Sequence, residues 1–474
     1  MKKELYIKIK DFLREVIRDT EFEGHVMTVG GCVRDELMGL EIKDIDMCVS
    51  LPEGGIRFAE WLKEKGLTKK GVTVYPNYGT AMLHLKAFPE VELEFVQTRK
   101  EKYIDHSCRN PQTAFGTIED DCMRRDLTIN ALYCDISTDR IIDITGNGVE
   151  DIHDHIIRTP ADPDLTYDDD PLRILRCIRF ASRYGWDIEK ETMDGMKRNA
   201  FRLEIITKER IHDELCKMLT CKHPVMAMEL LRETGAMHYV IPEFEKTYAM
   251  TQNEYHFGTV WEHTMKVISE VANSPAMQEE DKLILILSAL LHDIGKIRCR
   301  EVSEDGKVHF LKHELKSYDM IEGIMRTLKF SNDDIAEVRF LALHHMDCKS
   351  WGYECEHMKD KKLRKLQYLC RTEQRFKRLI CLIHADNMAH AEGKCMPKQV
   401  PIIISRTEEM IEDGTSMFGF KGFLTGKEVM EIKGIKPGPH VKECLEYLLK
   451  LAFAEPKKDK EWVIKSLLGY RLSK

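Results

Sequence analysis

The first hundred residues alternate between the hydrophobic spacing of helices and that of strands. Helical spacing occurs within residues 1–25 and again, after a pair of glycines, at Val33, Leu37 and Leu40. Strand spacing follows at 45–49, and a further helix is expected at 56–65 before strands at 71–75, 80–85 and 92–98. This alternation predicts a compact α/β head.

Beyond about residue 156 the spacing is mostly helical. Pro171 suits a first helical turn and Asp170 suits the N-cap before it, so a helix is predicted to begin there. Further helices are expected across 207–244 and 252–389, and a polar break at 392–398 precedes a helical tail. The predicted fold class is α+β: a small α/β head with a mixed or antiparallel sheet, followed by mostly helical domains.

Composition limits the classes of function. The 474 residues allow two to four domains, and with a net charge of −8 any nucleic-acid partner would be held by local basic patches. No run of 18 apolar residues exists and residues 1–4 lead into a charged helix, so we predict a cytoplasmic protein with no membrane partner. Fifteen cysteines without a CxxC pair indicate reduced thiols rather than a disulfide framework or a zinc ribbon.

The stretch from residue 30 to 46 combines a glycine turn with paired acids. Gly30 and Gly31 would let backbone N–H groups approach an anion at a helix N-terminus, where Arg34 can clamp a phosphate. Asp44 and Asp46 point to the same face of the expected strand because side chains alternate along it. Two carboxylates on one face suit a pair of Mg²⁺ ions, so the stretch predicts a site for metal and triphosphate.

Polar segments follow in the same region. Glu92 and Glu94 share a face of the last expected strand, and residues 103–116, with few apolar side chains, are predicted to form a mobile loop. The next segment offers cations for phosphates and polar groups for ribose or base. Its candidate residues are Arg124, Arg125, Asp126 and Asn130.

The helix expected after Asp170 has one basic and one apolar side. At about 100° per residue, one stripe consists of Arg173, Arg176, Arg179 and Arg183. The opposite stripe consists of Ile174, Cys177, Ile178 and Ala181. The pattern predicts a helix that packs with one side and presents the other as a basic surface.

In their order along the chain, these motifs resemble those of the class II tRNA nucleotidyltransferases and bacterial poly(A) polymerases. The glycine turn and the paired acids are similar to motif A, and Glu94 with Arg99 is similar to the third acidic position and its arginine. Residues 124–131 resemble the RRDxxxNA motif, with Leu127 where a phenylalanine is more usual. Residues 143–147 resemble an Asp-Pro-x-Gly-Gly hinge, from which they depart at two positions.

Asp170 and Arg173 resemble the amino-acid template of that family, in which an acid and an arginine hydrogen-bond the Watson–Crick edge of CTP or ATP. The resemblance implies a tRNA nucleotidyltransferase that adds or repairs the 3′-terminal CCA from CTP and ATP. The implied catalytic residues are Asp44, Asp46 and Glu94, with Asp44 and Asp46 holding Mg²⁺. The implied nucleotide-binding residues are Gly30, Gly31, Arg34, Arg124, Arg125, Asp126, Asn130, Asp170, Arg173, Arg176 and Arg179.

A second constellation lies between residues 252 and 389. His263 lies in an amphipathic helix, the pair His292-Asp293 ends an apolar run, and Asp386 lies in another helix. These residues resemble the HD superfamily of metal-dependent phosphohydrolases, whose ligands bind one divalent ion. His313 and His345 are available for a second ion. The resemblance implies that these residues bind a divalent transition metal. The alternative is that this part of the chain is a purely structural spacer between the body and the tail.

The resemblance covers nearly the whole chain and implies four domains. These are a nucleotidyltransferase head (1–155), a helical neck and body (156–245), an HD domain (246–390) and a helical tail (391–474). Alternative functions are a poly(A) polymerase, a partial enzyme that adds only CC or A, and a catalytically inactive RNA-binding scaffold. The sequence leaves the oligomeric state open.

Overall fold

The computed structural model describes residues 3–76, 79–102, 112–256 and 258–472. The chain forms two compact units, Met1–Pro242 and Glu243–Lys474. The four-domain division stays a prediction. Within the described residues, no helix combines the length and the apolar character needed to cross a membrane.

The first unit begins with a seven-stranded mixed sheet in the order β3-β4-β5-β2-β1-β8-β9. Its strands are β1 (Val26–Val29), β2 (Ile45–Val49), β3 (Thr73–Tyr75), β4 (Thr80–His84), β5 (Glu92–Gln97), β8 (Leu132–Asp135) and β9 (Ile141–Asp143). Among the described strands of this sheet, β2 and β5 form the only parallel pair. The predicted α/β head with a mixed sheet is therefore confirmed.

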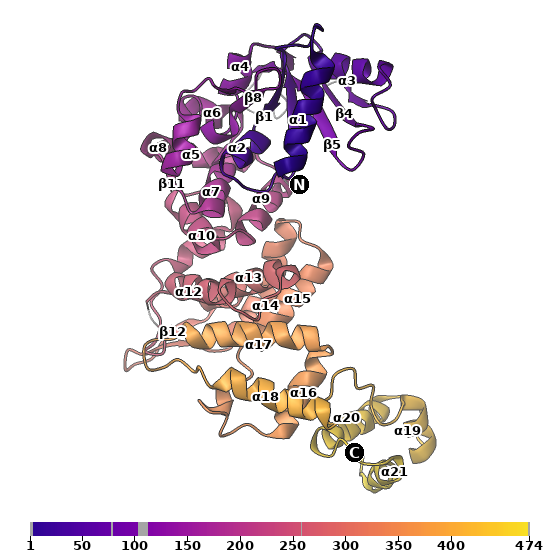
Figure 1. Ribbon diagram of the computed structural model, residues 1–474. Coiled ribbons are helices and arrows are strands. Elements are labelled where there is room, and N and C mark those ends of the chain that lie inside the picture. Colours follow the sequence, from indigo (N-terminus) through magenta and orange to yellow (C-terminus); the bar gives the residue numbers. More distant parts are fainter. Residues whose placement is uncertain (1–2, 77–78, 103–111, 257, 473–474) are drawn as a thin grey trace. The chain divides into compact units, whose positions relative to one another are not determined.

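One face of the sheet is covered by α1 (Lys3–Ile17) and α3 (Gly54–Glu64), as Figure 1 shows. The apolar stripe of α1, with Ile9 and Leu13, packs with Phe58 of α3 and with Phe95 of β5 in one buried cluster. The opposite face carries a smaller cluster that includes Val29 and Tyr133. That face is where the strand acids point.

The predicted loop at 103–116 is partly wrong. Residues 103–111 lie outside the described part of the chain, but Gln112–Phe115 form β7, which pairs antiparallel with β6 (Arg99–Lys102). A four-residue strand with no apolar alternation gives little signal in a sequence, because its pairing rather than its own pattern creates it.

Helices complete the first unit. They are α2 (Gly31–Leu37), α4 (Ile118–Met123), α5 (Gly148–Asp154), α6 (Pro163–Asp169), α7 (Leu172–Tyr184), α8 (Lys190–Asn199), α9 (Lys208–Leu219), α10 (Pro224–Glu233) and α11 (Met237–Val240). Helix α7 begins one residue later than expected, so Pro171 rather than Asp170 is its N-cap residue, although Oδ1 of Asp170 still accepts a bond from the Leu172 N–H at 3.1 Å.

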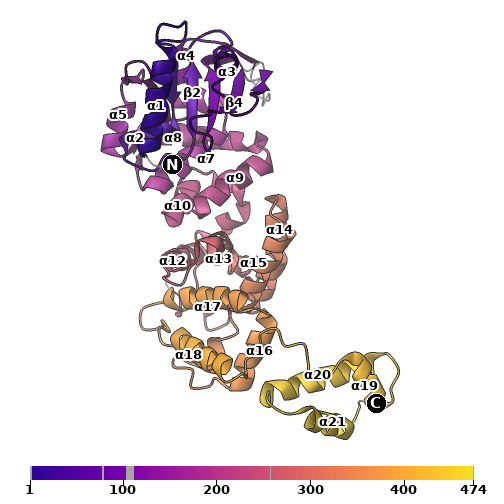
Figure 2. The same cartoon turned by 45° about the vertical axis from the view of Figure 1, so that its right-hand side comes forward.

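The second unit is almost entirely helical, as Figure 2 shows. Its helices are α12 (Val260–Ala272), α13 (Lys282–Leu291), α14 (His313–Thr327), α15 (Asn332–His344), α16 (Asp360–Cys370), α17 (Glu373–Met388), α18 (Gln399–Glu412), α19 (Gly426–Lys433), α20 (Pro439–Ala454) and α21 (Lys460–Gly469). The last three helices share a small core of their own, which includes Val429, Leu448 and Leu467.

Candidate functional site

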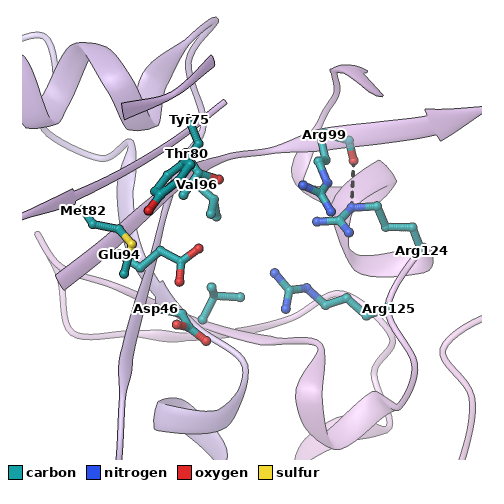
Figure 3. A pocket seen from close by; sticks show the side chains of 10 residues that line it. Asp46, Tyr75, Thr80, Met82, Glu94, Val96, Arg99, Arg124 and Arg125 are labelled. Atoms are coloured by element: carbon teal, nitrogen blue, oxygen red, sulfur yellow. Dashed lines mark hydrogen bonds between the residues drawn. The ribbon is translucent and has the colours of Figure 1, made fainter. Parts of the chain in front are cut away.

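Two carboxylates lie side by side on the face of the sheet opposite α1 and α3. In the parallel pair β2–β5, Asp46 is directly opposite Glu94, so both side chains point to the same face. Figure 3 shows them across a cavity from Arg125. The cavity has a volume of about 400 Å³ and is lined by Val29, Asp46, Tyr75, Thr80, Met82, Glu94, Val96, Arg99, Arg124 and Arg125.

The electrostatics of this cavity favour a bound cation beside the acids. Burial raises the pKa of Asp46, and Arg125 opposes that rise while Asp44 adds to it. Burial and then the charge of Asp46 raise the pKa of Glu94. Two neighbouring carboxylates that are each costly to ionise are stabilised in the charged form by a divalent ion. Asp44 is exposed and lies immediately before β2, not inside the strand as predicted.

The opposite wall of the cavity is cationic because one buried acid holds two arginines. Asp121 of α4 is fully buried, and its carboxylate lies 2.9 Å from Nη2 of Arg125 and 3.0 Å from Nε of Arg124. The Tyr133 hydroxyl also donates to Asp121, at 2.7 Å. Burial alone would raise the pKa of Asp121, but Arg125 and Arg124 outweigh it and lower that pKa to about 2.

Sequence reasoning missed the role of Asp121. The available signal was its spacing, since it precedes the two arginines by three and four residues, the separation at which helical side chains meet.

A buried polar chain links the glycine turn to the other motifs. Arg34 donates to Asp35 and to the side-chain oxygen of Asn130, and Asn130 donates in turn to Asp126 at 3.1 Å. Asp126 then pairs with Arg176 at 2.6 Å. Arg34 is 4% exposed and lines neither the cavity between the strand acids and Arg125 nor the one beside Asp170. Arg34 and Asn130 thus belong to a buried chain that ends at Asp126, and their role as nucleotide-binding residues stays a prediction.

The glycine turn itself approaches Arg125. Gly30 has φ of +73°, and its N–H already donates to the Leu132 carbonyl at 2.9 Å. A Cβ atom at Gly30 would lie 3.3 Å from Nη1 of Arg125. Glycine is needed here for the left-handed backbone and for this close approach. Gly31 follows as the first residue of α2.

A second cavity of about 270 Å³ contains the predicted template residues. It is lined by Arg124, Arg125, Asp126, Asp170, Leu172, Arg173, Arg176 and Arg210. Arg173 donates to the carbonyls of Thr166 and Arg124, at 3.1 and 2.7 Å, which leaves further N–H groups of the guanidinium for a ligand. Arg210 of α9 pairs with Asp170 at 2.7 Å. Arg210 was also missed, because forty residues separate it from Asp170.

The predicted basic surface of α7 is wrong for two of its four arginines. Arg173 and Arg179 are buried, at 7% and 9% exposure. Arg179 donates to Glu214 of α9 at 2.5 Å, so its charge is neutralised inside the unit. Helical periodicity identified the stripe correctly but does not reveal an acid that arrives from another helix.

The second unit brings together all four predicted HD ligands. Nε2 of His263 lies 3.2 Å from Oδ1 of Asp386 and 3.5 Å from Oδ2 of Asp293. Nε2 of His292 lies 3.3 Å from the same Oδ2. All four side chains are buried, and His263, His292 and Asp386 offer ligand atoms within 4.8 Å of one another.

Backbone carbonyls fix the tautomers of these histidines. Nδ1 of His292 lies 2.8 Å from the Ala289 oxygen, and Nδ1 of His263 lies 3.4 Å from the Ala389 oxygen. A carbonyl only accepts, so Nδ1 donates and Nε2 of the neutral ring carries a lone pair. Among the described atoms neither Nε2 has a hydrogen-bond partner. This arrangement of ring and carbonyl is the one found around metal-binding histidines.

Two lysines lie beside the carboxylates of this cluster. Nζ of Lys296 is 2.5 Å from Asp293, and Nζ of Lys349 is 2.8 Å from Asp386. Burial would raise the pKa of both aspartates, but His292 with Lys296, and Lys349 with His263, hold the two pKa values well below the usual range. The lysines and aspartates line a cavity of about 340 Å³, at whose edge Tyr255 is half exposed.

Three family models match the chain. The model described as "Poly A polymerase head domain" matches residues 26–158, "Probable RNA and SrmB- binding site of polymerase A" matches 185–247, and "HD domain" matches 255–389. A relative named "Multifunctional CCA protein", from Actinobacillus pleuropneumoniae, is 32% identical over 340 residues, which are 68% of this chain and 75% of that relative. This chain belongs to the class II CCA-adding enzyme family.

Other members of the class II CCA-adding enzyme family match to different extents. "CCA tRNA nucleotidyltransferase, mitochondrial" from Candida glabrata is 36% identical over 220 residues, which are 43% of this chain and 41% of that relative. The chain thus spans less than half the length of that relative in the match. The structure of the Bacillus stearothermophilus CCA-adding enzyme in complex with CTP has a TM-score of 0.64 at 20% identity and covers 98% of each chain. That likeness shows a shared fold.

The ion pairs of Asp121 generate a first prediction, on stability. Because the arginines lower its pKa in the folded state, the ionised carboxylate stabilises the fold above an ordinary aspartate pKa, and this contribution is lost as pH falls from about 4 towards about 2. Asp121→Asn should lower the free energy of unfolding near neutral pH by about 2 kcal/mol or more, since it also removes the buried negative charge that pairs with Arg124 and Arg125.

Urea denaturation of the wild type and the variant, followed across this pH range, measures the difference. The exposed neighbour Glu119 provides a matched control, because Glu119→Gln should change the free energy of unfolding by less than about 0.5 kcal/mol. A stability difference for Asp121→Asn that stayed constant down to pH of about 2 would contradict the assignment.

Proposed function

We propose that this protein is a tRNA nucleotidyltransferase that adds or repairs the 3′-terminal CCA of tRNA from CTP and ATP. The observation that carries the proposal is the facing arrangement of Asp46 and Glu94 against Arg99, Arg124 and Arg125 around one cavity. Carboxylates on one wall and guanidinium groups on the other match the charges of a metal-bound triphosphate. Membership in the class II CCA-adding enzyme family supports the substrates.

The two cavities of the first unit form one nucleotide site in this proposal. Arg124 and Arg125 line both of them. A nucleotide whose triphosphate contacts these arginines would extend its base towards Asp170 and Arg173, and its reacting phosphate towards the strand acids. Asp126 and Arg176, at the wall of the second cavity, are then near the ribose and base.

Base selection follows from hydrogen-bond chemistry at Asp170 and Arg173. A carboxylate accepts from an exocyclic amine, which both cytosine and adenine carry, and a guanidinium donates to their ring acceptors. Uracil and guanine present the wrong partners at those positions, which would leave buried polar groups unpaired. The same two residues therefore admit CTP and ATP and reject UTP and GTP.

The acids of the first unit fit Mg²⁺, since all the donors are carboxylate oxygens. Asp44 and Asp46 would hold the ions, with Glu94 adjacent to Asp46. Mg²⁺ held there would lower the pKa of the 3′-hydroxyl of the primer and would neutralise the charge of the leaving pyrophosphate. Arg99, Arg124 and Arg125 orient the phosphates on the other side of the cavity.

A second activity, phosphoester hydrolysis, is proposed for the cluster of the second unit. The buried set of His263, His292, Asp293 and Asp386 fits one divalent transition metal, because imidazole and carboxylate donors suit Mn²⁺, Co²⁺, Ni²⁺ or Fe²⁺. Lys296 and Lys349 are the cations that would bind a phosphate beside it. The proposed compartment is the cytoplasm, although the Candida glabrata relative is named as mitochondrial.

The main proposal is tested with tRNA transcripts that end before CCA, after CC and after CCA, each incubated with one labelled nucleotide. We expect CMP on the first, AMP on the second and nothing on the third, and Asp46→Ala should abolish both additions while tRNA binding persists. Long adenosine tails would instead indicate a poly(A) polymerase. Incorporation on one substrate alone would indicate a partial enzyme, and none at all would indicate an RNA-binding scaffold.

The template residues generate a prediction on specificity. Arg173→Ala should weaken the preference for CTP and ATP over UTP and GTP by about 1 to 3 kcal/mol, because a bidentate donor to the base is lost. Relative kcat/KM values for the four nucleotides measure it. Arg183→Ala is the matched control on the same helix, because Arg183 lies over the Tyr184 ring and is not among the residues lining the described cavities. Unchanged preference in Arg173→Ala would remove Arg173 from the template.

The two units should be separable in function. We expect metal-dependent hydrolysis of model phosphoesters by the Asp44→Ala protein. A His292→Ala, Asp293→Ala double variant should lose that hydrolysis and still add nucleotides. Hydrolysis by neither protein under any divalent ion, with no transition metal in the purified wild type, would favour the structural spacer.

A further inference from the structure

The cavity of the strand acids continues past them onto β3 and β4. The register of the sheet places Tyr75 of β3 opposite Thr80 of β4, and Thr80 opposite Val96 of β5. In the next row, Met82 of β4 lies opposite Glu94 of β5. Residues opposite each other, and residues two positions apart on one strand, share a face of a sheet. All these side chains therefore lie on the face that carries the acids, and all of them line the cavity.

The wall of the cavity on this side of the acids is an uncharged shelf, which consists of Tyr75, Thr80, Met82 and Val96. Figure 3 shows the shelf on one side of Glu94 and the arginines on the other. Among the described residues that line the cavity, the cations are Arg99, Arg124 and Arg125. Guanidinium groups suit phosphates, whereas an uncharged and partly apolar surface suits the base and sugar of a nucleotide.

The aromatic ring of the shelf is accessible. The side chain of Tyr75 is 44% exposed although it lines the cavity, and Met82 and Val96 are half-buried beside it. An exposed aromatic ring offers a face on which a nucleic-acid base can stack. The shelf thus combines a stacking surface with an apolar floor that extends to Glu94.

The chemistry of the proposed reaction indicates an occupant for the shelf. In nucleotidyl transfer, the 3′-hydroxyl oxygen of the primer bonds to the α-phosphorus while the bond from that phosphorus to the oxygen of pyrophosphate breaks. Pyrophosphate keeps the electron pair of the broken bond, and the hydroxyl proton passes to water. The attacking and leaving oxygens are roughly in line. With the leaving phosphates on Arg124 and Arg125, the hydroxyl approaches from the opposite side of the acids, which is the side of the shelf.

We propose that the shelf binds the 3′-terminal nucleoside of the tRNA primer, with its base stacked on Tyr75 and its ribose beside Met82 and Glu94. The inference rests on the tRNA nucleotidyltransferase proposed above and concerns the acceptor rather than the incoming nucleotide. A primer that ends before CCA can end in any base, and after the first addition it ends in cytosine. Stacking suits each of these rounds because every base has a π-face.

Kinetics with two kinds of primer test the inference. The full chain is assayed for CMP addition to a transcript that ends before CCA, and to the same transcript with an abasic 3′-terminal nucleotide. On the normal primer, Tyr75→Ala should lower kcat/KM for tRNA by about 10-fold or more, as expected for a lost base–aromatic stack, and should leave KM for CTP unchanged. Tyr75→Phe keeps the ring and should retain the wild-type value. On the abasic primer, Tyr75→Ala should equal the wild type, because the partner of the ring is already absent.

The controls separate the possible outcomes. Thr73→Ala is the matched control, because Thr73 is exposed on the same strand and is not among the described residues that line this cavity. An unchanged kcat/KM in Tyr75→Ala, an equal loss on both primers, or a rise in KM for CTP instead of the loss on tRNA overturns the subsite. In each of these cases CMP is still added, so the proposed function stands. A wild-type protein that extends no primer overturns the proposed function and the occupant of the shelf with it.

Discussion

The parallel pairing of β2 with β5 is the constraint on which the first unit depends. All other neighbours in the sheet are antiparallel, whereas a parallel pair needs a crossover connection. Residues 50–91 provide it with α3, β3 and β4, and α3 covers the opposite face of the same strands. The register places Asp46 beside Glu94, and a slip of one residue would turn one of them into the apolar core.

Most of the elements of this unit could be predicted, because their apolar spacing is set by the cores they cover. The stripe of α1 and the alternation of β4 and β5 correspond to the buried cluster between helices and sheet. What could not be predicted is the pairing that depends on partners distant in sequence. Strand β7 exists through its bonds to β6, and Arg179 is buried because Glu214 lies opposite it.

The difference between local patterns and partners distant in sequence also applies to the residues of the candidate site. Arg124, Arg125, Asp170 and Arg173 were found from their motifs, since short spacings carry their chemistry. Arg34 and Asn130 form a buried chain that ends at Asp126, and their contact with a nucleotide stays a prediction. A motif identifies residues that act together, but burial decides which of them contact the ligand and which position the others.

In the proposed function, the two units would select different ions by the atoms they offer. The first presents carboxylate oxygens alone beside guanidinium groups that suit phosphates, which favours hard Mg²⁺ with a bound triphosphate. The second presents imidazole nitrogens whose lone pairs are fixed by backbone carbonyls. These carbonyls belong to residues three positions before each ring, at Ala289, Phe310 and Ala342, so the local backbone itself sets the tautomer. A cluster kept only for stability has no need of rings that all expose acceptors to one another. The repeated use of that orientation at His292, His313 and His345 therefore supports the proposal that the cluster binds a metal ion.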